Sequence, residues 1–584
     1  DGICFDKCAD WLREHHPDRP VHYERAREKN NRNTDIVSWM YARPWEIADY
    51  VKEPKERPFI ICEYSHAMGN SNGNLKEYWE IFYGDNQAQG GFIWDWRDQG
   101  LQAVVPDEYR GERVSDVYRG KPCYVGGDWY PDDRYLTDHT PVNDGLLSAD
   151  GYPHPGLIAL KKVQQDVLVE AVDLSQLRFR LTNRFYFRSL KDYCGATWRL
   201  LEEGRPIATG AVVLEGANDD SLDLGPQESR EFAVSLDGVP RKAGREYVLD
   251  FRFKLLEATP WGPAGHELAW EQFELPTKAG ADAPRAEGAL PLVVEEQDGQ
   301  IVIRGREFVA QFDKERGALS GYAWRGMELL AAPVEPDFWR APVDNDRGAK
   351  FPEKLGVWRN AGQELEIDSV DVDVEDADGV RIADIRFQGR LKSVGDAGYD
   401  VRYVVHGSGA VEVTVDYAPN DPDAAPVLPR FGTLWTLDGS LDRIAWYGRG
   451  AQPTYSDRKQ APLGVFTGSV ADQFVSYFRP QENGNKVDVR WVAVTNASGI
   501  GLLATGSPTL SVGASPFDKA QMEQALYEFQ LKPTSRTYLN LDLLQMGVGG
   551  NDSWGSTPMR PYMPENREYS YSFTIQGIDQ PPLP

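Results

Sequence analysis

A carboxylate stands at the end of a short apolar run in the segment Pro58-Phe-Ile-Ile-Cys-Glu63-Tyr-Ser-His66-Ala-Met-Gly-Asn70-Ser. The apolar run predicts a buried parallel strand that ends at Glu63, and the Gly- and Asn-containing turn after it predicts a loop. In α/β barrels the reacting side chains sit at such strand ends. Glu63 is therefore the first candidate for a catalytic carboxylate.

Neighbouring segments repeat this pattern. A second β-rich run, residues 34–41, ends in an aromatic residue with a titratable hydroxyl, Tyr41, and a third, residues 90–96, ends in Trp94-Asp-Trp. Residues 20–24 form a weaker run before them. Apolar residues at helical spacing in residues 5–12 and 75–82 predict helices. The predicted order is helix, strand, strand, helix, strand, helix, strand, and four strands of this kind make half of an eight-stranded α/β barrel.

Four predicted strands are only half of a barrel, and this bears on the start of the chain. The first helix has no strand before it, and four twisted parallel strands alone would leave two unpaired edges. We therefore expect the chain to begin in the middle of a barrel. Either it is a fragment, or another chain supplies the missing half.

The remainder of the chain is predicted to be rich in β-structure. In residues 248–255 the odd positions are apolar and polar residues lie between them, which is typical of half-buried antiparallel strands, and residues 178–182 alternate in the same way. Such runs recur up to about residue 275 and predict a small β-sandwich. Residues 276–288 have no apolar period and predict a linker. Strands resume beyond it over a length that favours a large two-sheet domain. The predicted domains are residues 1–165, 166–283 and 284–584.

Composition excludes some classes of partner. The 584 residues carry a formal net charge of −27, which argues against nucleic acid or an anionic membrane as a partner. No run of 18 apolar residues and no signal peptide is present. Five cysteines, an odd number, do not suggest a disulfide framework, so a reducing, cytoplasmic location is expected. Export stays open if the true N-terminus lies upstream.

Several motifs together resemble one family. Residues 40–43 (Met-Tyr-Ala-Arg), 63–71 and 91–96 are similar to the nucleophile region of the large β-galactosidases of glycoside hydrolase family 2. Residues 340–346 (Arg-Ala-Pro-Val-Asp-Asn-Asp) and 549–554 (Gly-Gly-Asn-Asp-Ser-Trp) are similar to that family's C-terminal domain. The motifs follow in the right order, and the resemblance covers essentially the whole chain.

The resemblance implies a fold and an activity. The fold would be the second half of a (β/α)8 barrel, an immunoglobulin-like β-sandwich and a large C-terminal β-sandwich. The activity would be retaining hydrolysis of terminal β-D-galactose from β-galactosides such as lactose. The family's proton donor falls upstream of residue 1, so a separate N-terminal half would supply it, and the chain alone is expected to be inactive. A homo-oligomer is also expected.

The resemblance also implies roles for individual residues. Glu63 would be the nucleophile, because retaining glycosidases use two carboxyl groups about 5 Å apart, one of which attacks the sugar. Tyr41 would hydrogen-bond this carboxylate and keep it ionised. The expected substrate-binding residues are Met40, His66, Asn70, Trp94, Asp144 and Trp554.

Two cations belong to the expectations. Asp144 occupies the place where family members put a side-chain oxygen ligand for sodium beside the sugar. The residues before it depart from the family's usual aromatic-containing pattern, which puts the sodium site in question. The family's catalytic magnesium takes ligands upstream of residue 1, so no magnesium ligand is assigned.

Alternatives remain open from the sequence. Tyr41 and Trp94 could be packed barrel side chains, and His66 could be a core histidine whose hydrogen bonds are satisfied. A different activity of the same family, such as β-glucuronidase, is the alternative enzyme, although the long C-terminal domain with Trp554 argues against it. A carbohydrate-binding or scaffolding subunit without catalysis is the alternative from another class.

Overall fold

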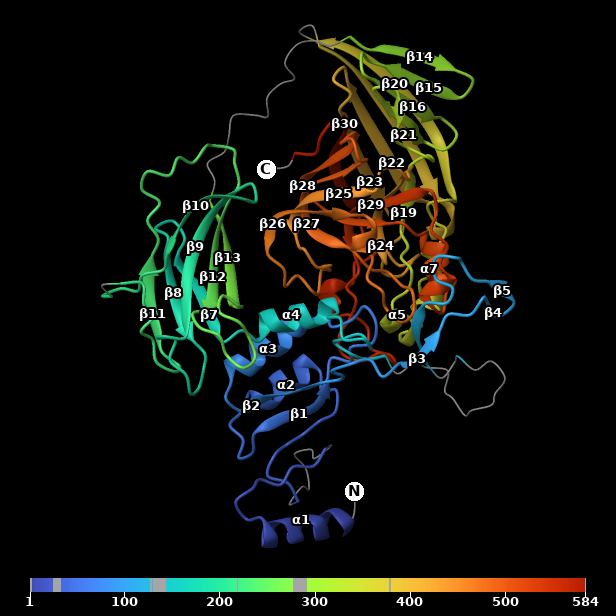
Figure 1. The fold of residues 1–584 in the computed structure, drawn as a ribbon. Coiled ribbons are helices and arrows are strands. Elements are labelled where there is room, and N and C mark those ends of the chain that lie inside the picture. Colours follow the sequence, from blue (N-terminus) through green and yellow to red (C-terminus); the bar gives the residue numbers. More distant parts are fainter. Residues whose placement is uncertain are drawn as a thin grey trace.

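The computed structural model of the chain describes residues 3–24, 33–126, 129, 143–217, 219–276, 291–377 and 380–582. Figure 1 shows an N-terminal α/β part at the bottom, a small β-sandwich at the left and a large β domain at the upper right. Each has its own hydrophobic cluster, containing Ile61, Phe251 and Phe312 respectively. Beyond residue 276, the predicted linker lies outside the described residues.

The N-terminal part is built on parallel strand pairing. β1 (Phe59–Tyr64) and β2 (Ala88–Ile93) run parallel, with Phe59 opposite Ala88 and Tyr64 opposite Ile93. Residues 37–40 add to the free side of β1 through parallel bridges from Val37 to Phe59 and from Met40 to Glu63. Residues 144–147 lie along the segment that follows β2, where Arg97 and Leu147 form a parallel bridge. Four neighbouring segments therefore run in one direction.

Helices follow the apolar periods of the sequence. The predicted helices are confirmed as α1 (Ile3–His15) and α3 (Leu75–Gly84). The structure adds α2 (Pro44–Val51) and α4 (Pro155–Val163), each with proline in its first turn, where the missing N–H costs nothing. Figure 1 shows α2, α3 and α4 beside β1 and β2, and α1 apart from them at the lower end.

Two of the predicted barrel strands differ from the structure. Residues 20–24 form no strand, because the N–H of Val21 donates to the Asp35 carboxylate at 2.7 Å and its carbonyl accepts from the Asp35 N–H at 2.8 Å. Residues 34–41 pair only at Val37 and Met40. The Thr34 hydroxyl donates to the Ile36 carbonyl at 2.7 Å, which bends the start of this segment.

Residues 101–125 leave the barrel part as two small hairpins. They are β3 (Leu101–Val104) with β6 (Pro122–Val125), and β4 (Glu108–Tyr109) with β5 (Glu112–Arg113). Tyr109 and Val125 pack with Tyr527 and Phe529 of the large domain. This excursion therefore fastens the barrel part to the large domain through an apolar contact.

The small sandwich has a four-stranded sheet, β10-β9-β12-β13, and a three-stranded sheet, β11-β8-β7. The alternation predicted in residues 248–255 lies in β12, but one polar position is fully buried. Asp250 is buried because Arg199 and Arg252 pair with its carboxylate at 2.6 and 2.8 Å. The strands are β7 (Val167–Asp173), β8 (Arg178–Asn183), β9 (Cys194–Glu202), β10 (Arg205–Ala211), β11 (Ser229–Ala233), β12 (Tyr247–Leu255) and β13 (Glu267–Leu275).

The large domain contains a five-stranded sheet, β14 to β18 in order, and a twelve-stranded sheet that holds the remaining strands. Short helices α5 (Asp344–Gly348), α6 (Phe351–Lys354) and α7 (Lys519–Gln524) lie between strands. The strands are β14 (Val293–Gln297), β15 (Gln300–Arg304), β16 (Phe308–Asp313), β17 (Ala318–Trp324), β18 (Met327–Glu328), β19 (Glu335–Asp337), β20 (Leu365–Ala377), β21 (Val380–Leu391), β22 (Ala397–His406), β23 (Val411–Ala418), β24 (Arg430–Asp438), β25 (Arg443–Arg449), β26 (Leu463–Ser469), β27 (Lys486–Thr495), β28 (Gly501–Ser515), β29 (Arg536–Gln545) and β30 (Tyr569–Ile578).

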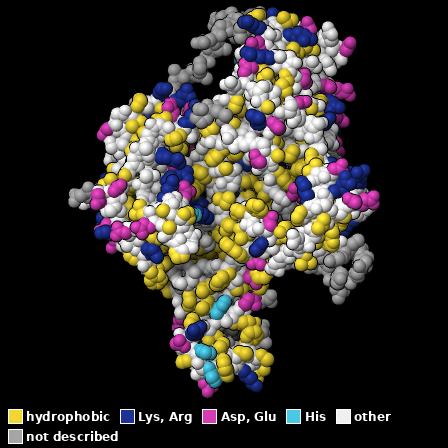
Figure 2. All heavy atoms as spheres, in the orientation of Figure 1, with side chains coloured by type: hydrophobic (Ala, Val, Ile, Leu, Met, Phe, Trp, Pro, Cys, Tyr) yellow, Lys and Arg dark blue, Asp and Glu magenta, His cyan; other side chains and the backbone are white. Residues whose placement is uncertain are grey.

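The surface carries both signs of charge. Figure 2 shows acidic and basic side chains interspersed over the two sandwiches, with histidines at the lower, N-terminal end. Within the described ranges, no helix is long and apolar enough to cross a membrane.

Candidate active site at the barrel strand ends

Glu63 is the penultimate residue of β1, and Tyr41 lies beside it. The Tyr41 N–H donates to the Glu63 carbonyl at 2.7 Å, directly after the bridge between Met40 and Glu63. Burial raises the pKa of the Tyr41 phenol, and the Glu63 carboxylate, which accepts a hydrogen bond from that phenol, raises it further. A phenol that keeps its proton is a hydrogen-bond donor for an ionised carboxylate. The backbone pairing thus holds a neutral donor against Glu63.

His66, Asp144 and Trp94 meet next to this pair. The His66 Nε2 lies 3.4 Å from Asp144 Oδ2, and the Trp94 Nε1 hydrogen bond to the same oxygen is 3.4 Å long. The His66 ring approaches Tyr41 edge-on, with ring centroids 6.0 Å apart. Asp144 is among the charges that raise the Tyr41 pKa. The structure thus brings these predicted residues together although they come from three separate strand ends.

Trp554 reaches the same place from the large domain. Its ring stands perpendicular to Tyr41 with centroids 4.7 Å apart, and its centroid is 5.3 Å from that of His66. The side chain is nevertheless 58% exposed. A largely exposed indole at the edge of this group has a free surface on which a ligand can pack.

Residues beside Trp554 fasten its loop to the barrel part. Arg43, two residues after Tyr41, forms an ion pair with Asp552 at 2.5 Å. Asp552 also accepts the backbone N–H groups of Trp554 and Ser556 at 3.1 and 2.9 Å. The Asp552 carboxylate therefore fixes both the shape of the loop and its distance from the barrel strand ends.

Asn70 lies in a different environment from the one expected of it. It is only 1% exposed, and its side-chain N–H donates to the Glu482 carbonyl at 2.7 Å. Its side-chain oxygen accepts from the buried Arg458 guanidinium at 2.8 Å. These contacts engage both the N–H and the oxygen of the amide, and both partners belong to the large domain. The structure therefore places Asn70 at the junction with the large domain.

Three neighbouring carboxylates, Asp98, Asp144 and Asp344, form an acidic floor of the site. Burial raises the pKa of Asp98 to about 7, and the nearby carboxylates of Asp144 and Asp344 add to the shift, although the Gly145 N–H opposes it by donating to Asp98 at 2.7 Å. Burial also raises the pKa of Asp344. Carboxylates crowded in a buried place favour either a shared proton or a bound cation.

Asn143 and His154 add polar atoms beside this floor. Both ends of the buried Asn143 amide, and Nε2 of the buried His154, have no hydrogen-bond partner among the described residues. The Asn143 oxygen and the Asp144 carboxylate are the kind of donors that a hard cation takes. Among the described residues, however, no group of three or more His, Cys, Asp or Glu side chains is arranged to hold a metal ion.

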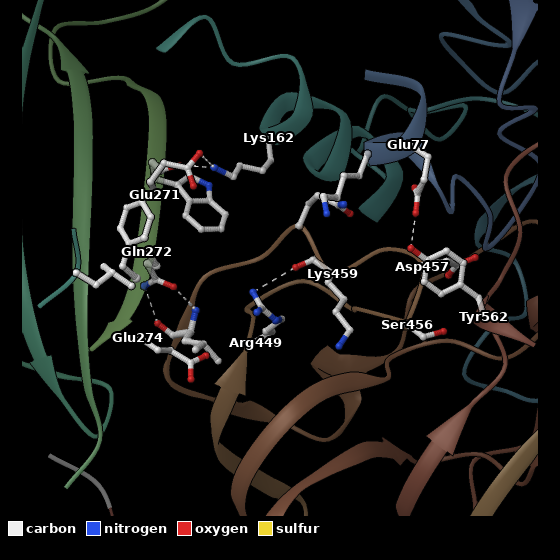
Figure 3. A pocket seen from close by; sticks show the side chains of 16 residues that line it. Glu77, Lys162, Glu271, Gln272, Glu274, Arg449, Ser456, Asp457, Lys459 and Tyr562 are labelled. Atoms are coloured by element: carbon white, nitrogen blue, oxygen red, sulfur yellow. Dashed lines mark hydrogen bonds and ion pairs between the residues drawn. The ribbon is translucent and has the colours of Figure 1, made fainter. Parts of the chain in front are cut away.

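A hollow of about 540 Å³ lies elsewhere, between β13, the barrel helices and the large domain, and none of the predicted site residues lines it. Figure 3 shows Lys162 directed to Glu271, and Glu77 to Tyr562. Lys162 is thus paired with Glu271. One Glu77 carboxylate oxygen accepts the Tyr562 hydroxyl, while the other has no hydrogen-bond partner among the described residues. Since none of the predicted site residues lines this hollow, we take the cluster around Glu63 as the candidate functional site and the hollow as a space between domains.

Sequence reasoning missed several residues of the site. Arg43, Asn345 and Ser553 belong to quoted motifs but received no role, and their contacts join segments hundreds of residues apart. Asp98 received none either. It follows Trp94 by four residues, and a carboxylate so near a strand end was a usable signal.

Family comparisons agree with this domain order. Residues 1–169 match the TIM barrel domain of glycosyl hydrolases family 2, residues 179–276 match beta-galactosidase domain 4, and residues 304–575 match the beta galactosidase small chain. Together the three matches extend over most of the chain.

Curated relatives point the same way. Three are named beta-galactosidases: one from Priestia megaterium (34% identical over 99% of this chain and 53% of its own), BgaC from Bifidobacterium adolescentis (32%, 96% and 52%) and beta-galactosidase 2 from Enterobacter cloacae (30%, 98% and 54%). The chain spans about half the length of these relatives. A solved putative mutarotase from Salmonella typhimurium covers 49% of this chain at 11% identity with a TM-score of 0.28, too little to support an argument.

Proposed function

The chain belongs to glycoside hydrolase family 2, and we propose that it forms the nucleophile-bearing part of a retaining β-galactosidase. The observation that carries the proposal is the Glu63 carboxylate at a strand end, beside the protonated Tyr41 hydroxyl, whose ring is in turn in contact with the exposed Trp554 ring. A rigid strand end is a suitable place for a nucleophile, because a small displacement of the attacking atom costs much of the rate. The names of the relatives support β-galactosides, such as lactose, as substrates.

The proposed reaction has two steps. A Glu63 carboxylate oxygen attacks the anomeric carbon while the glycosidic C–O bond breaks and the leaving oxygen takes a proton from a general acid. Water, giving its proton to the same group, then attacks the glycosyl ester and frees Glu63. Tyr41 donates a hydrogen bond to the Glu63 carboxylate and orients it before the attack.

The sugar would lie between two walls of the site: the barrel wall, which holds Glu63 and Tyr41, and the large-domain wall, which holds Trp554. Trp554 offers its exposed indole to the apolar face of the hexose, while His66 and Asp144 present polar atoms to its hydroxyl groups. Trp94 and Met40 line the strand ends next to Glu63. For Asn70, the buried amide favours a positioning role, since it anchors the loop after β1 to Arg458.

The general acid would come from a polypeptide that corresponds to the N-terminal half of the relatives. Several large apolar side chains of the barrel part are exposed, among them Trp11 (53%) and Phe92 (66%). Exposed apolar side chains beside an open set of strands are a surface that a complementary half-barrel would cover. We propose this half as the partner, and a homo-oligomer of the assembled halves as the working form.

A sodium ion would fit as an addition at Asp144. The Asp144 carboxylate and the Asn143 side-chain oxygen, which no described residue hydrogen-bonds, would supply two oxygen donors, and the remaining ligands would come from the sugar, from water or from the partner. Such an ion would neutralise part of the acidic floor and orient sugar hydroxyls. Magnesium would take its ligands from the partner, and we assign none in this chain.

Replacement of the nucleophile tests the proposal. In the chain combined with an N-terminal half, Glu63→Gln should lower kcat for a nitrophenyl galactoside by several orders of magnitude and leave the melting temperature intact. The amide keeps the shape and removes the attacking charge. Glu53→Gln, whose side chain is 82% exposed, is the matched control and should keep normal turnover. Near-normal hydrolysis by a folded Glu63→Gln enzyme would refute the assignment.

A further inference from the structure

A line of hydrogen bonds runs from the large domain to His66. The Asn345 side-chain N–H donates to the Val548 carbonyl at 3.0 Å. The Ser553 hydroxyl donates to the Asn345 side-chain oxygen at 2.7 Å, and Ser553 Oγ lies 2.8 Å from His66 Nδ1. The line thus joins four residues from three segments that are far apart in the sequence: His66, Asn345 and the 548–553 loop.

The direction of each bond fixes where the His66 proton must be. Since the Val548 carbonyl can only accept, it holds the NH2 end of the Asn345 amide and turns the amide oxygen towards Ser553. That oxygen takes the single hydroxyl proton of Ser553. Ser553 Oγ is then left with its lone pairs towards His66, so a hydrogen bond between them requires the proton on Nδ1.

The other ring nitrogen faces an acceptor. Nε2 of His66 lies 3.4 Å from Asp144 Oδ2, which already accepts the Trp94 indole N–H. Without the line, the ring would gain most by placing its proton on Nε2 and donating to the carboxylate, which would close the space between them. With the line intact, a neutral ring presents two acceptors, Nε2 and the carboxylate, side by side.

We propose that Asn345 and Ser553 are positioning residues that hold the His66 proton on Nδ1 and so keep Nε2 free to accept a hydrogen bond from a hydroxyl group of the galactoside. The use of this acceptor by a sugar rests on the proposed function, whereas the position of the proton does not. The two residues act through His66 and touch no reacting atom.

The loop around Ser553 is held independently of its hydroxyl. A side chain at Gly348 would meet the Ser553 carbonyl oxygen at 2.0 Å, so the backbones of the two residues are in close contact. On its other side, Asp552 is paired with Arg43. Replacing only the Ser553 hydroxyl should therefore change the ring of His66 more than the course of the loop.

The first test reads the proton directly and needs no activity. The chain has eight histidines, so ring nitrogen NMR signals of the 15N-histidine-labelled chain are few and a His66→Gln sample assigns the one of interest. We expect a protonated Nδ1 on His66, and a proton moved to Nε2 in Ser553→Ala. Ser553→Thr keeps a hydroxyl and should keep the wild-type pattern. Ser556→Ala, in the same loop without contact to His66, should also keep it.

The outcomes separate clearly. A wild-type ring that carries a proton on Nε2, alone or together with one on Nδ1, or a ring whose signals are unchanged in Ser553→Ala, would overturn the proposal. Loss of the wild-type pattern in Ser556→Ala as well would mean that the loop, not the hydroxyl, controls the ring, and would overturn it too.

The second test asks whether a sugar uses the acceptor. In the chain combined with the N-terminal half, Ser553→Ala should raise KM for a galactoside roughly 2- to 10-fold, with a smaller effect on kcat. Among monodeoxy galactosides, one should lose this sensitivity, because it lacks the hydroxyl that donates to Nε2. Equal sensitivity for every monodeoxy sugar would refute the sugar contact. Activity that is absent from the wild type would instead refute the proposed function and leave the NMR result standing.

Discussion

The two walls of the site are positioned by different kinds of contact. On the barrel wall, backbone pairing places Glu63 and Tyr41, with a bridge from Met40 and a 2.7 Å hydrogen bond to the Glu63 carbonyl. On the large-domain wall, side chains place Trp554, chiefly the ion pair between Arg43 and Asp552. Strand ends fix a reacting group rigidly, whereas a loop held by side chains adapts to what it binds.

This difference divides the expected effects of mutation. Changes on the barrel wall should act on the chemical step, because they move or remove the attacking group. Changes on the large-domain wall should act mainly on substrate binding. Measured effects that do not follow this division would show that the two walls do not differ in this way.

The largest effect should come from leaving the barrel incomplete. We expect residues 1–584 alone to show no measurable hydrolysis of β-galactosides, because the proposed N-terminal half would supply both the general acid, which contributes about 10²–10⁴-fold, and the other part of the barrel wall. Adding a polypeptide with the first four barrel strands should restore activity, with second-order dependence on the two chains when both are dilute.

An activity assay on the purified chain, with mass spectrometry to exclude a partner, checks this prediction. Strong activity without a partner would mean that another carboxylate of this chain serves as the acid. Asp95 would be the first to replace, since it lies next to Trp94.

Trp554→Ala should give the next largest effect. If the indole is a sugar platform, its loss should raise KM at a cost of about 1–3 kcal/mol, as for other aromatic stacking platforms. Thermal stability should hardly change, because the side chain is 58% exposed. Steady-state kinetics and a melting curve decide the point, and a large fall in Tm with unchanged KM would make Trp554 structural.

Asp552→Asn should have a smaller effect in the same direction. The amide oxygen still accepts the N–H groups of Trp554 and Ser556, but the charge that pairs with Arg43 is gone. We expect KM to rise by less than in Trp554→Ala. Asp49→Asn is the control, since that side chain is 66% exposed. A kcat loss with unchanged KM would contradict the division between the walls.

Asp98→Asn should have the smallest effect, and on stability instead of activity. The pKa of Asp98 is raised to about 7 in the fold, so the folded chain binds more protons than the unfolded chain between about pH 4 and 7. The contribution of Asp98 to stability is therefore full below that range and is lost as the pH rises through it. The melting temperature, measured at several pH values across this range, should fall less steeply with rising pH for Asp98→Asn than for the wild type. An identical pH dependence in both chains would contradict the raised pKa of Asp98.

Local sequence pattern was enough where a segment forms its own structure. The apolar run before Glu63 is β1, and the helical spacing of residues 75–82 is α3. It failed where distant contacts decide. Residues 20–24 predict a strand, yet the backbone of Val21 is hydrogen-bonded to Asp35 and no strand forms.

The site shows the same limit. The family resemblance implies a substrate contact for Asn70, and the sequence does not show that Arg458, 388 residues further on, donates to its amide oxygen. Ser553 and Asn345 could not be linked to His66 from sequence, because nothing in the order of residues shows that three loops meet. Periodicity predicts which side chains point one way, not which distant partner they meet.

The central claim is that Glu63 attacks the sugar, and covalent trapping tests it most directly. The chain combined with an N-terminal half would be incubated with an activated 2-deoxy-2-fluoro-β-galactoside, which slows breakdown of the glycosyl ester, and then digested for peptide mass spectrometry. The account predicts one added fluorogalactosyl group, on Glu63 in the peptide that contains β1. A label on any other residue, or an active enzyme that gains no label, would contradict it.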